Sequence, residues 1–294
     1  MMVSIIIVTY NSERFIRECI RSVEKHVKGV DYEIIVSDNA SKDKTVKIVY
    51  SEFKHVRLIR NRRNIGFAAS NNKAVERAGG EYLFFLNPDT VMTNDAVTIL
   101  KDYLAEHEDA GCVGAKLEYY DGRHQYSCRQ FPNYLNVFFG RRSVFRTIFP
   151  SNPISKSYML ETLDYTKVQK VDWVMGAAFM MRKNDFCDIG LFDEQFFLFV
   201  EDTELCYRMK CRGFNVYYVP DAKIKHYHGG SGKRGFNSSH LHHNLGMYKF
   251  FKKHRIKNSL LRFVLYCSIV VRLFFVFIEE ELLFAYESIT SRHI

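Results

Sequence analysis

Short apolar runs alternate along the chain with segments of helical periodicity. An apolar run of about four to eight residues bounded by turn residues is typical of a strand buried on both faces. Such runs predict strands at residues 3–8, 32–36, 56–60, 83–86, 111–117 and 214–219. Apolar positions that recur with the helical period predict helices at 44–53, 70–78, 93–107 and 205–212, and an earlier one with Phe15, Ile16, Cys19, Ile20 and Val23 facing inward. This order predicts an α/β fold with a Rossmann-like, mostly parallel sheet flanked by helices.

Polar residues follow several of these strands directly. The run at residues 81–86 ends in Asn87, Pro88 and Asp89, and the strand at 32–36 leads into a loop with Asp38. Ligands of open α/β sheets bind outside the carboxyl ends of the strands. We therefore expect Asn87 and Asp89 to meet a ligand or a metal. In the loop at residues 61–68, Gly66 permits an unusual backbone conformation, and the loop could present backbone amides to phosphate.

Two regions lack this alternation. Residues 118–171 mix aromatic residues, basic residues and three prolines without a clear period, which predicts an insertion over the sheet that contacts an acceptor or a membrane. Residues 260–278 are nearly continuously apolar, and lysines and arginines precede them. We favour a helix that lies in a membrane surface, with residues 249–288 as the contact region. A buried helix of the core or of a homodimer, and a spanning helix, are the alternatives.

Composition adds little to this pattern. The chain has 294 residues and a formal charge of +9, which suggests an anionic partner such as nucleotide phosphates, nucleic acid or an acidic membrane. Its seven cysteines lack metal-like spacing, so we expect reduced thiols in a cytosolic setting. The first residues carry no basic leader, so we expect no signal peptide.

Six short motifs occur in a characteristic order. They are Val8-Thr9-Tyr10-Asn11, Ser37-Asp38-Asn39-Ala40-Ser41, Asn64-Ile65-Gly66-Phe67, Asn87-Pro88-Asp89, Trp173 to Gly176, and Glu201-Asp202. In this combination the chain resembles the family-two inverting glycosyltransferases of the GT-A fold, and most of all their rhamnosyltransferase-type branch. The resemblance covers residues 3–250 and suggests a glycosyltransferase domain at 1–250, with a nucleotide-sugar-binding half at 1–117, an acceptor and catalytic half at 118–250, and a helical tail at 251–294.

The resemblance implies an enzyme of polysaccharide biosynthesis. Its donor would be a nucleotide sugar of the dTDP-rhamnose or UDP-hexose type, its cofactor a divalent Mg or Mn ion, and its acceptor a hydroxyl of a glycan or polyprenyl-linked molecule. It would work in the cytoplasm, peripherally at the inner face of the cell membrane.

The resemblance also implies roles for individual residues. Donor binding falls to Thr9, Tyr10, Asn11, Asp38, Asn64, Gly66, Phe67, Asn87 and Asp89. Asp89 would be the principal metal ligand, because Asn87 stands where the family has a second acid and brings no charge; His226 or His228 would complete the site. Asp202 would be the general base, with Glu201 in support. Trp173, Met175 and Gly176 would contact the acceptor.

Each of these residues also has a purely structural interpretation. Asp89 suits a turn, Glu201 and Asp202 suit the first turn of a helix, and Trp173 suits a core. Two other functions compete with glycosyl transfer. A nucleotidyltransferase shares the sheet and the metal, but the N-terminal loop is not glycine-rich. A nucleic-acid-binding protein would use the positive charge, but that charge gathers beside the apolar tail and no reading motif occurs, so we expect no nucleic-acid partner.

Overall fold

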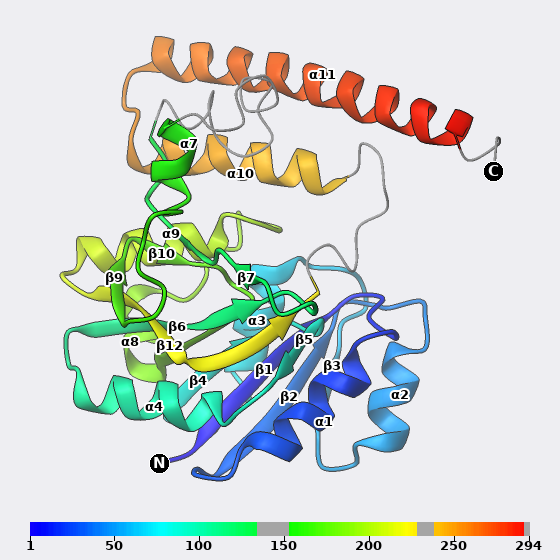
Figure 1. Ribbon diagram of the computed structural model, residues 1–294, viewed down its shortest axis with the longest axis vertical. Coiled ribbons are helices and arrows are strands. Elements are labelled where there is room, and N and C mark those ends of the chain that lie inside the picture. The colour runs from blue at the N-terminus through cyan, green and yellow to red at the C-terminus, as the bar shows by residue number, and fades with distance from the viewer. Residues whose placement is uncertain (134–152, 228–237, 291–294) are drawn as a thin grey trace. The chain divides into compact units, whose positions relative to one another are not determined.

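The computed structural model describes residues 1–133, 153–227 and 238–290 (Figure 1). The chain forms two compact units. The first is made of Met1–Phe131, Leu163–Phe197 and Glu201–Ser231, and the second of Pro132–Thr162, Leu198–Val200 and Gly232–Ile294. Every candidate site residue that the structure describes belongs to the first unit.

A mixed sheet forms the centre of the first unit. Its main strands are β1 (Val3–Thr9), β2 (Tyr32–Asp38), β3 (Arg57–Arg60), β4 (Tyr82–Leu86), β5 (Thr90–Met92), β6 (Ala110–Glu118), β11 (Ala178–Arg182) and β12 (Asn215–His226). They lie in the order β3-β2-β1-β4-β11-β6-β12-β5. Strands β3, β2, β1 and β4 are parallel neighbours, as are β6 and β12. Strand β11 runs antiparallel between β4 and β6, so its first residue, Ala178, lies opposite Leu86 at the end of β4.

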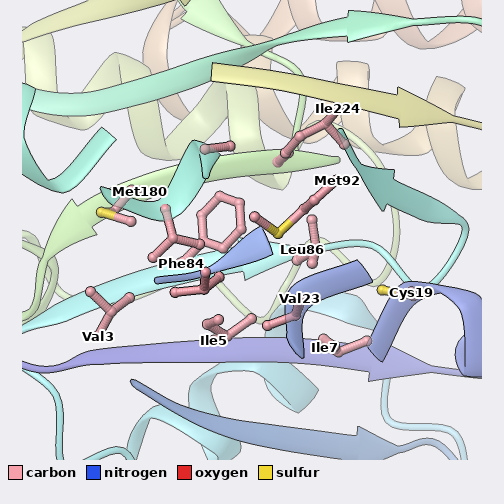
Figure 2. Close-up of a cluster of buried hydrophobic side chains, with 14 of the residues drawn as sticks. Val3, Ile5, Ile7, Cys19, Val23, Phe84, Leu86, Met92, Met180 and Ile224 are labelled. Carbon is pink, nitrogen blue, oxygen red and sulfur yellow. The ribbon is translucent and has the colours of Figure 1, made fainter. Parts of the chain in front are cut away.

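The core lies where the apolar runs predicted it. All seven residues of β1 and all five of β4 are buried, and both strands lie in the interior of the sheet. Val3, Ile5 and Ile7 of β1 pack in one cluster with Phe84 and Leu86 of β4 (Figure 2). The five residues predicted for the inner face of the first helix are also buried, which confirms the helical period.

The helices of this unit are α1 (Ile16–His26), α2 (Thr45–Glu52), α3 (Phe67–Val75), α4 (Ala96–Glu106), α8 (Lys183–Ile189) and α9 (Glu201–Cys211). Three predicted starts were wrong. Helix α4 begins at Ala96 and not at residue 93, and its cap is Asp95, whose carboxylate accepts from the Thr98 N–H. Helix α3 begins at Phe67, directly after Gly66, and not at residue 70. Helix α9 begins at Glu201 rather than 205, since acids are favourable in a first turn.

The region at 118–171 contains short strands that its sequence did not reveal. Strand β7 (His124–Gln125) pairs with β6, and β9 (Gln169–Val171) pairs with β12, so both extend the central sheet. Strands β8 (Cys128–Arg129) and β10 (Trp173–Val174) form a separate antiparallel pair. Strands of two or three residues are too short to show a period of two. The structure therefore corrects the prediction of a simple insertion for these segments.

The second unit contains α7 (Pro153–Tyr158), α10 (Ser238–His254) and α11 (Ser259–Thr290). Helices α10 and α11 contact each other, with the rings of Tyr248 and Tyr266 5.8 Å apart. The segment Ser259–Ile278 is long and apolar enough to cross a membrane. Its exposed apolar side chains are Leu260, Leu261, Phe263, Val264, Tyr266, Val270, Val271, Phe274, Phe275, Phe277 and Ile278.

Candidate active site

The loops after β1 and β2 are locked together through Asp38. The Asp38 carboxylate is 1% exposed and accepts hydrogen bonds from the Thr9 hydroxyl at 2.9 Å, from the Ser41 hydroxyl and from the Ser41 N–H at 2.9 Å. The parallel register of the two strands aligns Thr9 with Asp38. Ser41 was included in the second sequence motif but was given no role, although it lies three residues after Asp38 as a turn-forming serine would.

Two further residues of the first motif lie at the same edge. Asn11 has a positive φ of 52°, and its N–H donates to Ser41 Oγ at 2.9 Å while its side-chain oxygen accepts from the Lys42 N–H at 2.8 Å. Asparagine tolerates this conformation better than most residues. Tyr10 is 46% exposed, so its ring is open to a ligand.

The loop that enters α3 is fitted closely around Gly66. Gly66 has φ +89°, and a Cβ atom there would lie 2.6 Å from the carbonyl oxygen of Phe197. The Asn64 side chain accepts from the Gly66 N–H at 2.9 Å, and the Phe67 N–H donates to the same Phe197 oxygen at 2.7 Å. Only glycine fits this backbone and this space. The loop is therefore fixed against the segment that leads toward α9.

Asn87 and Asp89 lie in the turn between β4 and β5. The Asn87 N–H donates to Ala177 O at 2.9 Å, while its carbonyl oxygen accepts from the Thr90 hydroxyl at 2.7 Å. One oxygen of Asp89 lies 3.5 Å from Nε2 of His226, the last residue of β12, and β5 pairs with β12 beside this contact. The antiparallel ladder thus joins two predicted metal ligands that are far apart in the sequence. His228 lies outside the described residues.

The chemistry of these groups fits a divalent cation. A carboxylate and a histidine nitrogen are both metal ligands, and the two side chains face each other. Within the described ranges no group of three or more His, Cys, Asp and Glu side chains could hold a metal ion. Magnesium is commonly bound through one or two carboxylates together with substrate phosphates. The pair of Asp89 and His226 therefore suits an ion that is held jointly by the protein and a phosphate-bearing ligand.

Asp202 lies in the first turn of α9 and its carboxylate is held by backbone groups. Oδ2 accepts from the Gly176 N–H at 2.8 Å and Oδ1 from the Thr203 N–H at 2.7 Å. Gly176 precedes Ala177, whose carbonyl oxygen is the partner of the Asn87 N–H. Backbone contacts therefore connect Asp202 to the end of β4, and Asp89 lies in the turn that follows this strand.

Burial and charge perturb both acids at the start of α9. Burial raises the pKa of Asp202, while the N–H groups of Gly176 and Thr203 oppose this rise by stabilising the carboxylate. Glu201 is buried, and burial together with the neighbouring Asp202 charge raises its pKa well above the ordinary range. When two adjacent carboxyl groups share one proton, the more deeply buried one holds it. Backbone N–H groups favour the ionised form of Asp202, whereas nothing comparable offsets the rise in the pKa of Glu201.

The motif from Trp173 to Gly176 is held mainly by hydrogen bonds to neighbouring backbone groups. The indole Nε1 of Trp173 donates to Gln130 O at 2.9 Å, and the Met175 N–H donates to Ser127 O at 2.8 Å. Both side chains are half-buried. Gly176 lies against the base candidate, since a Cβ atom at this position would be 3.2 Å from Asp202 Oδ2. Of the three, Gly176 alone is connected by a hydrogen bond to the other candidate residues that the structure describes.

Comparisons with known proteins agree with this architecture. The sequence profile described as glycosyl transferase family 2 matches residues 4–183. An N-acetylglucosaminyl-diphospho-decaprenol L-rhamnosyltransferase of Mycobacterium tuberculosis is 26% identical over 261 residues, which are 84% of this chain and 82% of the relative. Rhamnosyltransferase WbbL of Escherichia coli is 27% identical over 275 residues, 88% of this chain and 96% of the relative.

Solved structures support the same fold. The crystal structure of GalNAc-T7 with UDP, GalNAc and Mn2+ aligns with a TM-score of 0.63 at 15% identity, over 86% of this chain and 48% of that chain. A likeness at this identity concerns the fold, which is of the GT-A type. The family profile covers more than half of the chain and the sequence resemblance is confirmed. The chain therefore belongs to glycosyl transferase family 2 and is a glycosyltransferase similar to the rhamnosyltransferases.

Proposed function

We propose that this glycosyltransferase moves a sugar from a nucleoside-diphosphate donor to a hydroxyl of a glycan or polyprenyl-linked acceptor, with inversion at the anomeric carbon. The observation that carries the proposal is the position of Asp202. Its carboxylate is fixed by the Gly176 N–H, next to the residue that binds the end of β4. A base at one end of the site and a cation-binding pair at the other are what an in-line displacement requires.

Asp202 acts as the general base. The acceptor oxygen attacks the anomeric carbon while its proton passes to the Asp202 carboxylate, and the bond to the nucleoside diphosphate breaks on the opposite face. One displacement inverts the configuration, so no carboxylate nucleophile is required. The Gly176 and Thr203 N–H groups orient Asp202 and favour its ionised form against the effect of burial on its pKa. Neutral Glu201 adds no competing charge beside it.

Asp89 and His226 hold a divalent Mg or Mn ion, with Asn87 as a weaker neighbouring ligand. Such an ion supplies positive charge to the departing diphosphate. Support comes from the facing Asp89 and His226 side chains. GalNAc-T7, which shares the fold, has been crystallised with UDP and Mn2+.

The nucleotide lies over the loops after β1, β2 and β3. Asp38 contacts the base and Tyr10 offers an exposed ring, while Thr9 and Asn11 hold the two loops in place. Asn64, Gly66 and Phe67 shape the wall beside the donor sugar. Because the two curated relatives named above are rhamnosyltransferases, dTDP-rhamnose is the first donor to test, ahead of UDP-hexoses.

Trp173, Met175 and Gly176 form the acceptor side. A lipid-linked acceptor agrees with the name of the mycobacterial relative, which acts on a decaprenol-linked sugar. The protein then works at the cytoplasmic face of the membrane as a peripheral enzyme of polysaccharide assembly.

Helix α11 supplies the membrane contact. Its apolar side chains are exposed over Ser259–Ile278, and lysines 249, 252 and 253 precede it on α10. Apolar burial and attraction to anionic lipid together hold a helix in the interface. Co-sedimentation of the full chain with anionic vesicles tests this role. Phe263→Asp and Phe274→Asp should weaken binding, whereas pelleting equal to that of the wild type would contradict it.

A donor panel tests the proposed reaction. The full chain is incubated with dTDP-rhamnose and UDP-hexoses, an acceptor preparation and Mg2+ or Mn2+, and nucleoside diphosphate release is measured. At least one donor should be consumed, and NMR of the product should show an inverted anomeric centre. Asp89→Asn should reduce turnover by about two orders of magnitude or more, as the loss of electrostatic stabilisation predicts. A retained configuration, or full activity in Asp89→Asn, would contradict the proposal.

A further inference from the structure

Gln125 contacts His226 from a strand that none of the motifs includes. It belongs to β7, where it pairs with Leu117 of β6, and its side chain is buried with 2% exposure. Its Oε1 lies 2.8 Å from Nδ1 of His226. The two residues are 101 positions apart in the sequence, so the fold brings them together.

The hydrogen bond determines which nitrogen of His226 is available. A neutral imidazole carries its proton on one ring nitrogen and a lone pair on the other. With its oxygen toward the ring, Gln125 can accept only from a protonated Nδ1, and the lone pair of a neutral imidazole then lies on Nε2. Nε2 is the atom that faces Asp89 Oδ1 across 3.5 Å. Histidines that bind metals usually donate their second ring N–H to an acceptor in this manner, which fixes both tautomer and ring orientation.

The other end of the Gln125 amide supports a role beyond packing. Its Nε2 is buried and has no hydrogen-bond partner among the described residues. A buried amide with an unused donor is unfavourable, so an apolar side chain of similar size would suit a purely structural position better. Turning the amide by 180° would instead make it a donor to Nδ1 and move the His226 proton to Nε2. The structure has the first orientation, in which the amide matches the tautomer whose lone pair faces Asp89.

We propose that Gln125 is a positioning residue that sets the tautomer of His226 and thereby the affinity of the Asp89–His226 pair for a divalent cation. The inference rests on the proposed metal site, but it concerns a residue that touches neither donor nor acceptor. It predicts that the acceptor atom of residue 125 matters and that its volume alone does not.

Two substitutions separate these properties. Gln125→Glu keeps an oxygen acceptor, whereas Gln125→Met keeps the approximate volume and removes the acceptor. Mn2+ affinity of the full chain is measured from the EPR signal of free Mn2+, without nucleotide and with a saturating nucleoside diphosphate, and nucleotide without protein is the blank. Gln125→Met should bind Mn2+ about 10- to 100-fold more weakly than the wild type, the usual effect of losing such a partner. The Mn2+ affinity of Gln125→Glu should stay within about threefold of the wild-type affinity. This change is much smaller than the effect of removing the hydrogen-bond partner.

A second readout needs no metal. Two-bond proton–nitrogen correlations on histidine-labelled protein report the tautomer, and His226→Gln assigns the His226 signal among the 11 histidines. The wild type and Gln125→Glu should show a proton on Nδ1, and Gln125→Met should show a changed tautomer. If Gln125→Met does not fold, Gln125→Glu still tests the inference, because a neutral His226 that is protonated on Nε2 alone in that variant would contradict it.

The outcomes distinguish the two proposals. If the wild type binds no Mn2+, either alone or together with a nucleoside diphosphate, the metal site is refuted, and the NMR result alone decides the role of Gln125. If the wild type binds Mn2+ and Gln125→Met binds it equally well with an unchanged tautomer, the inference about Gln125 is wrong while the metal site stands.

Discussion

Glu201 gives rise to a pH-dependent instability that can be measured directly. Its carboxyl group is buried at the start of α9, and Oε2 has no hydrogen-bond partner among the residues that the structure describes. Burial, and after it the charge of Asp202, raises the pKa of Glu201 well above the ordinary range. In the unfolded chain a glutamate titrates at about pH 4.3. The folded protein therefore retains a proton that the unfolded chain releases.

The size of the effect follows from proton linkage. Between the unfolded and the folded pKa, the unfolded state binds fewer protons, so the free energy of unfolding falls by about 1.4 kcal/mol per pH unit. Glu201→Gln replaces the protonated acid by a neutral group of the same shape and removes this term. Below about pH 4.3 the two proteins should be nearly equally stable. Above it the variant should be increasingly more stable, until the folded pKa of Glu201 is passed.

Urea unfolding at several pH values between about 5 and 8 measures the difference, because the midpoint shifts with stability at constant slope. Glu106→Gln, on the exposed side of α4, is the matched control and should differ from the wild type by a constant amount. A Glu201→Gln protein whose advantage does not grow with pH, or which is less stable than the wild type at neutral pH, would refute the reasoning.

Two further substitutions test how the site is held in shape. Gly66→Ala should lower the free energy of unfolding by more than about 2 kcal/mol, because it adds a steric clash to a positive φ. Gly122 has φ +84° with open space around it, so Gly122→Ala should lower this free energy by only about 1 kcal/mol. Equal losses in the two variants would contradict this expectation. Glu204→Ala should lower the free energy of unfolding, measured in urea, by about 3–5 kcal/mol, because it removes the buried carboxylate that pairs with Arg208. Glu52→Ala, at an exposed ion pair, should have a small effect. Similar losses in the two variants would contradict the assigned burial.

Much of the fold followed from the apolar pattern. Residues buried on both faces give uninterrupted runs, so β1 and β4 could be located, as could the inner face of α1. The polar ends of β1, β2 and β4 also identified one edge of the sheet as the candidate site. The antiparallel entry of β11 could not be predicted, because the order of strands depends on long-range packing rather than on local sequence.

The contacts that complete the site were not readable from the sequence. The bond between Gly176 N–H and Asp202 depends on β11 and α9 meeting, and the contact of His226 with Asp89 depends on the pairing of β12 with β5. Gln125 lies in a two-residue strand without a recognisable motif. Sequence motifs predicted which residues carry chemistry, but only the fold shows which of them touch.

The central claim is that Asp202 accepts the acceptor proton, and Asp202→Asn tests it most directly. The variant keeps the size of the side chain and an oxygen that can accept from the Gly176 N–H, but it cannot serve as a base. With the donor identified by the panel, kcat should fall by about two to four orders of magnitude, while the Kd for the donor, measured by calorimetry, should stay within about threefold of the wild type. A variant that keeps wild-type kcat, or that loses activity only because it no longer binds the donor, would contradict the account.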